Sequence, residues 1–190
     1  MKRQCITFTR LHDAQKAYQK GQILFAADVT ESGFKQYCIF ESYEGYMKEY
    51  TNRMNQKKGN HFYEVINGPQ KIYLDIDIKG DCDAVEGLNQ IEKVIMEQYP
   101  DAQINIYTSG EKSYHIIVNG YLVEDAEDNK KRVIEIAYRV THPIGGFIDL
   151  KVYKKNQLFR LLQCSKKGKD NIKVLLRGIN TLMSSLVCEV

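Results

Sequence analysis

The stretch KIYLDIDI, residues 71 to 78, decides the fold because its pattern is that of a β-strand with acidic residues on one side only. Aliphatic residues alternate along it with Tyr73, Asp75 and Asp77, so one face should be buried and the other should carry two carboxylates. Two such carboxylates repel each other unless a counter-charge lies close by, and hard oxygen ligands suit Mg²⁺ or Mn²⁺. A solvated strand face is the alternative interpretation of the same pattern.

The residues that follow predict the order βαββαβ, in which this strand is the first. The expected elements are strands at 71–78, 103–108, 113–118 and from 147 onward, and helices at 85–99 and 124–140. This order is the split βαβ arrangement of ferredoxin-like and RRM-like sheets, so the predicted class is α+β. The sheet order would be four, one, three, two, with both helices on one face and the other face open.

Polar side chains from three strands should meet on that open face. Asp149 alternates with apolar neighbours in the fourth strand, and Ser113 and His115 alternate with apolar residues in the third. Because both strands neighbour the first, these residues should lie beside Asp75 and Asp77. Clustered carboxylates strain one another without a cation, so we predict a metal site at Asp75, Asp77 and Asp149 that holds two Mg²⁺ or Mn²⁺ ions.

Two further segments could bind phosphate groups. Lys112, Ser113 and His115 in the sequence GEKSYH offer a charge, a hydroxyl and an imidazole, which favours triphosphate binding over metal ligation. Residues 150 to 177 hold nine Lys or Arg and one Asp, although the net charge of the whole chain is only +3. Such a regional excess is typical of a polyanion-binding surface. Within it Arg160 lies among apolar residues, as in a strand, and we predict that it recognises phosphate.

The first 66 residues predict a small N-terminal α/β module. The turn sequence Asn67-Gly68-Pro69 separates them from the acidic strand, so we expect modules at 1–66 and at 67–190. A chain of 190 residues that is 43% hydrophobic is long enough to bury a core in such an arrangement.

Cysteine spacing and hydropathy exclude several classes of protein. The five cysteines are scattered without a C-x-x-C pair, which argues against a disulfide framework and against structural zinc. No apolar run approaches the ~18 residues that span a bilayer, and the first ten residues lack the apolar core of a secretory signal. We therefore expect an intracellular protein that has no membrane partner.

Most of the stretch from residue 37 to residue 176 resembles the archaeo-eukaryotic primase superfamily, and most closely its primase-polymerase type in eukaryotes and large DNA viruses. The three motifs of the family stand here in order as LDID around Asp75, as Ser113-Tyr114-His115 and as Ile148-Asp149. The flanking sequence HFYEVI and the SK-x-GK pattern at 165–169 match as well. The resemblance implies the primase fold, in which an RRM-like catalytic sheet follows an N-terminal module that contacts the DNA.

The resemblance also implies roles for single residues. Asp75, Asp77 and Asp149 would bind the catalytic ions, Ser113, His115, Arg160 and Lys166 would bind the triphosphate, and Tyr63 would lie near the nucleotide sugar. Three positions depart from the eukaryotic pattern: Asp77 stands for Glu, Gln157 for Arg, and Lys112 lies one place before the serine instead of two.

The implied activity is nucleotidyl transfer by a primase or primase-polymerase core, which joins dNTPs or NTPs on a single-stranded DNA template, with or without a primer. The resemblance also implies a helicase module or replication proteins as partners. The protein itself would act in the nucleus, in the cytoplasm or at a viral replication site. Other classes stay open: a metal-dependent nuclease would use the same acids with a water nucleophile. A non-catalytic RRM-like module would bind nucleic acid on aromatic residues, and a sugar-nucleotide transferase would need a different sheet.

Overall fold

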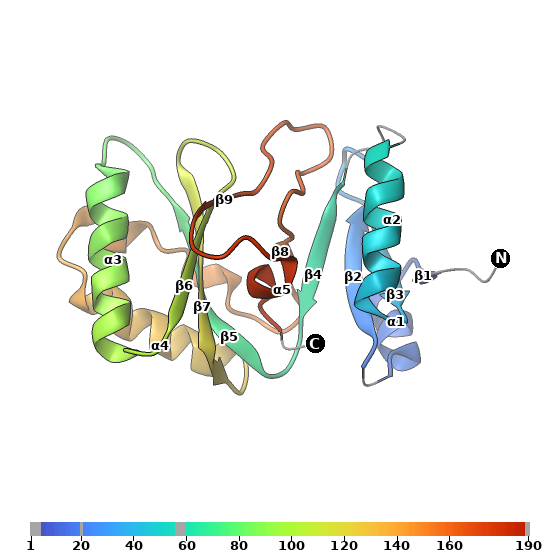
Figure 1. Cartoon of the computed structure of the whole chain (residues 1–190), viewed down its shortest axis with the longest axis horizontal. Helices are drawn as coiled ribbons and strands as arrows, with labels where there is room; N and C mark the ends of the chain where they lie inside the picture. The colour runs from blue at the N-terminus through green and yellow to red at the C-terminus, as the bar shows by residue number, and fades with distance from the viewer. Residues whose placement is uncertain (1–4, 20, 56–59, 189–190) are drawn as a thin grey trace. The chain divides into compact units, whose positions relative to one another are not determined.

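The computed structural model describes residues 5–19, 21–55 and 60–188, which form two units (Figure 1). Within these residues, unit 1 combines the chain up to Val65 with Leu158–Ile172, and unit 2 combines Ile66–Gln157 with the chain from Lys173 onward. The first crossing between the units lies one residue from the boundary expected after residue 66. The module expected at 67–190 is interrupted, because the chain returns to unit 1 within it.

This return is explained by β8 (Gln157–Arg160), which neighbours β4 (Phe62–Ile66) at the edge of the unit 1 sheet. The N–H group of Leu161 donates to the carbonyl oxygen of Phe62 at 3.1 Å and extends the contact. Arg160 and Lys166 therefore belong to unit 1, whereas the sequence placed both in the second module. A strand pairing between segments so far apart in the chain leaves no local signal.

Unit 1 is built on a five-stranded sheet in the order β1-β3-β2-β4-β8. Its remaining elements are β1 (Cys5–Phe8), α1 (Leu11–Ala17), β2 (Ile23–Asp28), β3 (Lys35–Phe40) and α2 (Tyr43–Asn55). Tyr46 of α2 is fully buried, and its ring centroid lies 4.7 Å from that of Phe25 and 5.5 Å from those of Phe40 and Phe62. This aromatic cluster packs α2 against β2, β3 and β4.

Unit 2 holds an antiparallel four-stranded sheet in the order β5-β7-β6-β9. Its elements are β5 (Gln70–Asp77), α3 (Ala84–Gln98), β6 (Gln103–Thr108), β7 (Ser113–Val123), α4 (Ala126–Arg139), β9 (Val174–Arg177) and α5 (Leu182–Ser185). Two antiparallel sheets and five α-helices in the described residues confirm the predicted α+β class. The expected order of the first three strands, one-three-two, is found as β5-β7-β6.

Helices α3 and α4 cover one face of the unit 2 sheet (Figure 1). Each begins at an aspartate, Asp83 for α3 and Asp125 for α4, whose carboxylate accepts two backbone N–H bonds of the first turn. Asn129 of α4 is fully buried and donates to the backbone oxygen of Lys71 at 3.0 Å. The aliphatic face of β5 is thereby covered, and its acidic face points the other way.

The fourth strand expected from residue 147 does not form. Two 3-10 helices, η1 (Pro143–Phe147) and η2 (Leu150–Val152), occupy this stretch, and a single bridge pairs Ile148 with Ile76 at the outer edge of β5. Pro143 begins η1, and Asp149 accepts the N–H of Lys151 at 2.9 Å and begins η2. The segment thus takes the expected place in the sheet order without the expected strand.

The face opposite α3 and α4 is only partly open, which corrects the expectation of an uncovered sheet. In the middle of β5, the ring of Tyr153 lies 5.1 Å from that of Tyr73. On β6, the side-chain amide of Asn105 donates to the carbonyl oxygens of Ile179 and Ser184 at 3.2 Å and 3.3 Å. The end of β5 is different, because Asp77 is exposed.

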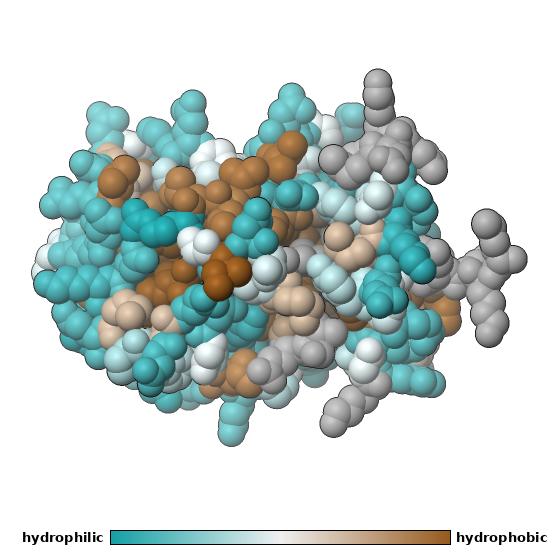
Figure 2. Space-filling view, viewed as in Figure 1, coloured by the Kyte–Doolittle hydropathy of each residue, from teal (hydrophilic) through white to brown (hydrophobic). Residues whose placement is uncertain are grey.

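Apolar side chains are exposed along β9, at the edge of the sheet opposite β5. Val174 and Leu176 are 44% and 54% exposed. Figure 2 shows an apolar area over the part of unit 2 where β9 lies in Figure 1. None of the helices in the described part of the chain has the length and apolar character needed to cross a membrane.

Candidate active site

Two polar pairs face each other across β5 and β7. Asp75 lies opposite His115, and Asp77 lies opposite Ser113. Paired residues of an antiparallel ladder point to the same face, so these four side chains share the face that α3 and α4 leave uncovered. Nε2 of His115 lies 3.5 Å from Oδ1 of Asp75. The side chain of Asp75 is 20% exposed and that of His115 only 7%, so the imidazole is held between the sheet and this carboxylate.

Asp149 lies on the other side of Asp75. The bridge between Ile76 and Ile148 sets the register, and the N–H of Asp149 donates to the carbonyl oxygen of Asp75 at 2.8 Å. Asp149, Asp75 and His115 therefore form one row across three neighbouring segments, with Asp77 and Ser113 beside it. We call these five residues the acidic face.

The turn between β6 and β7 closes one end of the acidic face. Oγ of Ser109 donates to Oγ of Ser113 at 3.1 Å, and its backbone N–H donates to the carbonyl oxygen of Ser113 at 3.0 Å. Lys112 is exposed, and its Nζ donates to the carbonyl oxygen of Gly80 at 2.9 Å. Lys112 thus ties this turn to the one that follows β5, at the same end as Asp77.

The donor set of the acidic face suits Mg²⁺ or Mn²⁺, because three carboxylates occupy neighbouring backbone positions. Among the described residues, however, no three acidic, His or Cys side chains already converge on one ion position. One oxygen of Asp149 accepts the N–H of Lys151, and Oδ1 of Asp75 faces His115. Ion binding would therefore require these side chains to turn on a backbone that already holds them side by side.

Two residues that the sequence did not single out lie on the same side of the sheet. Tyr107 of β6 is fully buried and lies opposite His115. Lys173 is fully buried as well, and its Nζ lies 4.7 Å from the ring centroid of Tyr107, a cation-π distance. Burial raises the pKa of Tyr107, so its phenol keeps its proton. The alternation of Asn105 and Tyr107 with Ile104 and Ile106 could have indicated the direction of Tyr107. Nothing marks Lys173 among the other basic residues.

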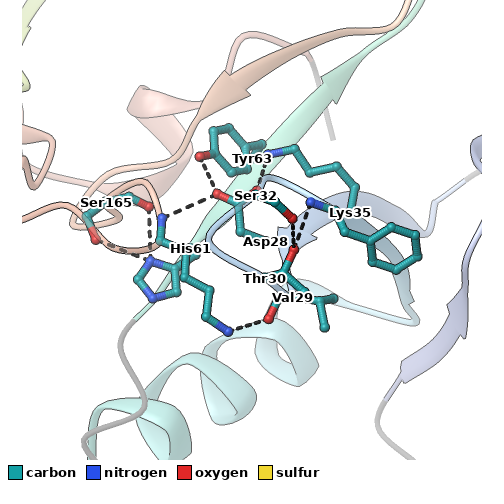
Figure 3. Close-up of polar contacts among 10 residues, drawn as sticks. Asp28, Val29, Thr30, Ser32, Lys35, His61, Tyr63 and Ser165 are labelled. Atoms are coloured by element: carbon teal, nitrogen blue, oxygen red, sulfur yellow. Dashed lines mark hydrogen bonds and ion pairs between the residues drawn. The ribbon is translucent and has the colours of Figure 1, made fainter.

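The other three residues predicted to bind the nucleotide belong to unit 1. Tyr63 is 6% exposed, and its hydroxyl donates to Oδ2 of Asp28 at 2.7 Å (Figure 3). Burial, and then the hydrogen bond to Asp28, raise the pKa of Tyr63, so this phenol is also protonated. Arg160 is 7% exposed, and its Nη1 donates to the carbonyl oxygen of Asn171 at 2.8 Å. Of these three residues, only Lys166 is exposed.

The structure thus brings Asp75, Asp77, Asp149, Ser113 and His115 together in unit 2, with Lys112 at the same end of the sheet. Comparison with models of protein families and with curated proteins gave no match.

Proposed function

We propose that this chain is the catalytic core of a primase or primase-polymerase, which joins nucleoside triphosphates on a single-stranded DNA template. The observation that carries the proposal is the acidic face, where Asp149, Asp75 and His115 form a row beside Asp77 and Ser113. Groups able to hold cations lie one strand away from hydroxyl and imidazole groups able to donate to phosphate. The primase fold is part of this proposal, and the strand order β5-β7-β6 with α3 and α4 on one face supports it.

Asp75, Asp77 and Asp149 would hold Mg²⁺ or Mn²⁺ through their carboxylate oxygens. Such ions, when bound, would neutralise phosphate charge and favour ionisation of the attacking hydroxyl. Without a cation, the same three carboxylates would repel a triphosphate. The acidic face would therefore accept a nucleotide only together with divalent ions.

In the proposed reaction, the 3′-oxygen of a primer or of a first nucleotide attacks the α-phosphorus of the incoming nucleotide. A new P–O bond forms, the bond to the β-phosphate breaks, pyrophosphate leaves, and the proton of the 3′-hydroxyl passes to solvent. Ser113 and His115 would donate to phosphate oxygens and fix their orientation. His115 suits this task because burial and the contact with Asp75 hold its ring in place. Positioning of this kind supplies much of the rate in phosphoryl transfer.

Other assignments stay predictions from the resemblance. Arg160 and Lys166 are predicted to bind the triphosphate, and Tyr63 to lie near the sugar, and all three belong to unit 1. Lys112 would have to release the carbonyl oxygen of Gly80 to reach a phosphate. The template, the primer and any helicase or replication partner are predictions of the same kind.

The proposal is tested by following the length of an end-labelled primer annealed to a single-stranded template, with nucleotides and Mg²⁺ or Mn²⁺. The wild type should lengthen the primer, and Asp75→Asn should slow the reaction by at least about 100-fold, because charge stabilisation is lost at the reacting phosphate. Asp101→Asn is the matched control, since Asp101 is an exposed aspartate of the same unit that lies outside the acidic face. A parallel reaction without primer distinguishes priming from extension.

Two results would overturn the proposal. Shortening of the labelled strand by the wild type, lost in Asp75→Asn, would instead make the acidic face the site of a metal-dependent nuclease. Metal-independent binding of DNA with neither reaction would leave a nucleic-acid-binding module.

A further inference from the structure

We infer that Asp28 is a positioning residue that holds the loop Ser165–Lys169 in shape, so that its exposed lysines can bind a triphosphate. We call this segment, with the sequence SKKGK, the basic loop. The choice of a triphosphate as the ligand rests on the proposed function, whereas the contacts of Asp28 do not. All residues involved belong to unit 1.

Asp28 ends β2 and is a buried carboxylate, 7% exposed, with donors on several sides (Figure 3). It forms an ion pair with Lys35 and accepts the hydroxyl of Tyr63 at 2.7 Å. Its Oδ2 also accepts the backbone N–H of Lys167 at 3.4 Å, a longer and weaker contact. Asp28 therefore connects β3, β4 and the basic loop at one buried point.

The donors around Asp28, among them the ammonium group of Lys35, favour its ionised form. Burial alone would raise the pKa of Asp28, but the hydrogen bonds from Lys35 and Tyr63 and the charge of Lys35 together lower it. An ionised carboxylate accepts charge-assisted hydrogen bonds, which are stronger than neutral ones. Neutral replacement of Asp28 should therefore weaken all of its contacts at once.

Contacts with three further residues, Val29, His61 and Asn60, fix the basic loop to the same part of unit 1. Nζ of Lys167 donates to the carbonyl oxygen of Val29, so this ammonium group pairs with the backbone that follows β2. Nδ1 of His61 lies 3.2 Å from Oγ of Ser165 and 3.1 Å from its carbonyl oxygen (Figure 3). The N–H of Ser165 also donates to the carbonyl oxygen of Asn60 at 3.0 Å. The start and middle of the loop are thus held by partners on both sides.

The loop then turns sharply and exposes its other lysines. The N–H of Lys169 donates to the carbonyl oxygen of Lys166 at 3.0 Å, and Gly168 adopts φ +76, a left-handed conformation that favours glycine. Lys166 and Lys169 are exposed, whereas Lys167 is half-buried. Two ammonium groups are thereby presented to solvent by a backbone that is already ordered. A preordered cationic loop binds a multivalent anion with a smaller loss of conformational entropy.

The inference gives Tyr63 a different task from the predicted contact with the nucleotide sugar. The hydroxyl of Tyr63 donates a hydrogen bond to Asp28, and Nζ of Lys35 lies 4.0 Å from the centroid of the Tyr63 ring. Tyr63 would therefore act on the ligand through Asp28 and the basic loop.

The test measures binding of inorganic tripolyphosphate to the full chain by calorimetry, without metal ions and without DNA. Lys166→Ala should weaken binding by about tenfold, and Asp28→Asn and Tyr63→Phe by about three- to tenfold, because a misplaced cation loses most of its pairing energy. Tyr37→Phe is the matched control, since Tyr37 packs against the same core cluster as Tyr63 and should bind normally. In the double variant Asp28→Asn/Lys166→Ala, the two losses should be less than additive, because part of the effect of Asp28→Asn acts through Lys166.

Exchange of backbone amides at residues 165–169 gives a second measurement, and it should be faster in Asp28→Asn and Tyr63→Phe than in Tyr37→Phe. Wild-type affinity in both Asp28→Asn and Tyr63→Phe, or losses that add fully to that of Lys166→Ala, would overturn the inference. If Asp28→Asn does not fold, Tyr63→Phe carries the test.

Tripolyphosphate binding with the expected coupling but no strand synthesis would refute the proposed function alone. Strand synthesis with normal KM for nucleotide in Tyr63→Phe would refute this inference alone.

Discussion

Asp75 and Asp149 lie directly opposite each other, and the N–H of Asp149 donates to the carbonyl oxygen of Asp75 at 2.8 Å. Within the described residues, a single bridge, between Ile76 and Ile148, joins their segments as sheet. It sets the register that puts both carboxylates on one face. The acidic face therefore depends on a short, irregular contact at the edge of β5. Changes at this contact should affect function more than stability.

Asp149 offers a way to separate these two effects. Its carboxylate accepts the N–H of Lys151 at 2.9 Å, so Asp149→Ala should lose a cap worth about 0.5–2 kcal/mol of unfolding free energy. Asp149→Asn keeps an acceptor oxygen and should unfold like the wild type. Both variants should lose nucleotide incorporation, because both remove a carboxylate from the acidic face. Thermal unfolding and a primer-extension assay measure the two effects, and an active Asp149→Asn would contradict the role of this carboxylate.

Gly87 of α3 lies against η1, the element that leads to Asp149. A Cβ atom at Gly87 would lie 2.7 Å from Nδ1 of His142 and 2.8 Å from Cβ of Ile144. Gly87→Ala should therefore destabilise the chain by about 1–3 kcal/mol, despite the better helix propensity of alanine. Gly146→Ala is the control, because a Cβ atom added there would meet no described residue within 4 Å other than its own chain neighbours. Urea unfolding of both variants checks the prediction, and equal stabilities would contradict it.

Ser113 is expected to act on nucleotide binding. Its hydroxyl lies on the acidic face opposite Asp77 and accepts a hydrogen bond from Ser109. Ser113→Ala should raise KM for the nucleotide roughly tenfold, because a hydrogen bond to a charged phosphate is lost, and should change kcat less. Ser109→Ala removes a hydroxyl from the same turn and should change KM much less. Steady-state kinetics of the two variants decide the point, and a larger effect of Ser109→Ala would contradict the assignment.

Asp28 should make stability depend on pH in the acid range. Its folded-state pKa is lowered, so its stabilising contribution is complete above the unfolded value of about 3.9 and is lost as pH falls through the folded value. The difference in unfolding free energy between the wild type and Asp28→Asn should be largest near neutral pH and shrink as the solution is acidified. Urea unfolding from pH 7 to pH 2 measures this difference. A gap that stays constant with pH would show that ionisation of Asp28 does not stabilise unit 1.

Local pattern in the sequence was enough to predict the centre of unit 2. The alternation around Asp75 and around His115 fixed the two strands and the faces of their side chains, because a strand has a period of two residues. The helical stripe from Val85 to Tyr99 matches α3, which ends at Gln98. The segment after Pro143 was expected to be a strand and is not one, because local 3-10 turns and the cap at Asp149 satisfy its backbone instead.

Long-range contacts account for the features that the sequence did not indicate. β8 pairs with β4 in the unit 1 sheet, and β9 pairs with β6 in the unit 2 sheet. Both strands lie in the stretch 150–177, whose excess of Lys and Arg does not indicate that its two strands belong to different sheets. The hydrogen bond from Tyr63 to Asp28 joins two strands far apart in the chain. No pattern of composition or spacing near Tyr63 distinguishes a hydroxyl used inside the fold from one offered to a ligand.

The central claim is that Asp75, Asp77 and Asp149 act together on divalent ions, and Mn²⁺ binding tests it most directly. Paramagnetic resonance follows free Mn²⁺ as protein is added in the presence of a nucleoside triphosphate, with Asp101→Asn as the control. We expect the wild type and the control to bind Mn²⁺ alike, and Asp75→Asn and Asp149→Asn each to bind at least about tenfold more weakly, because a charged ligand is lost. Equal Mn²⁺ binding by Asp75→Asn and the wild type would contradict the claim.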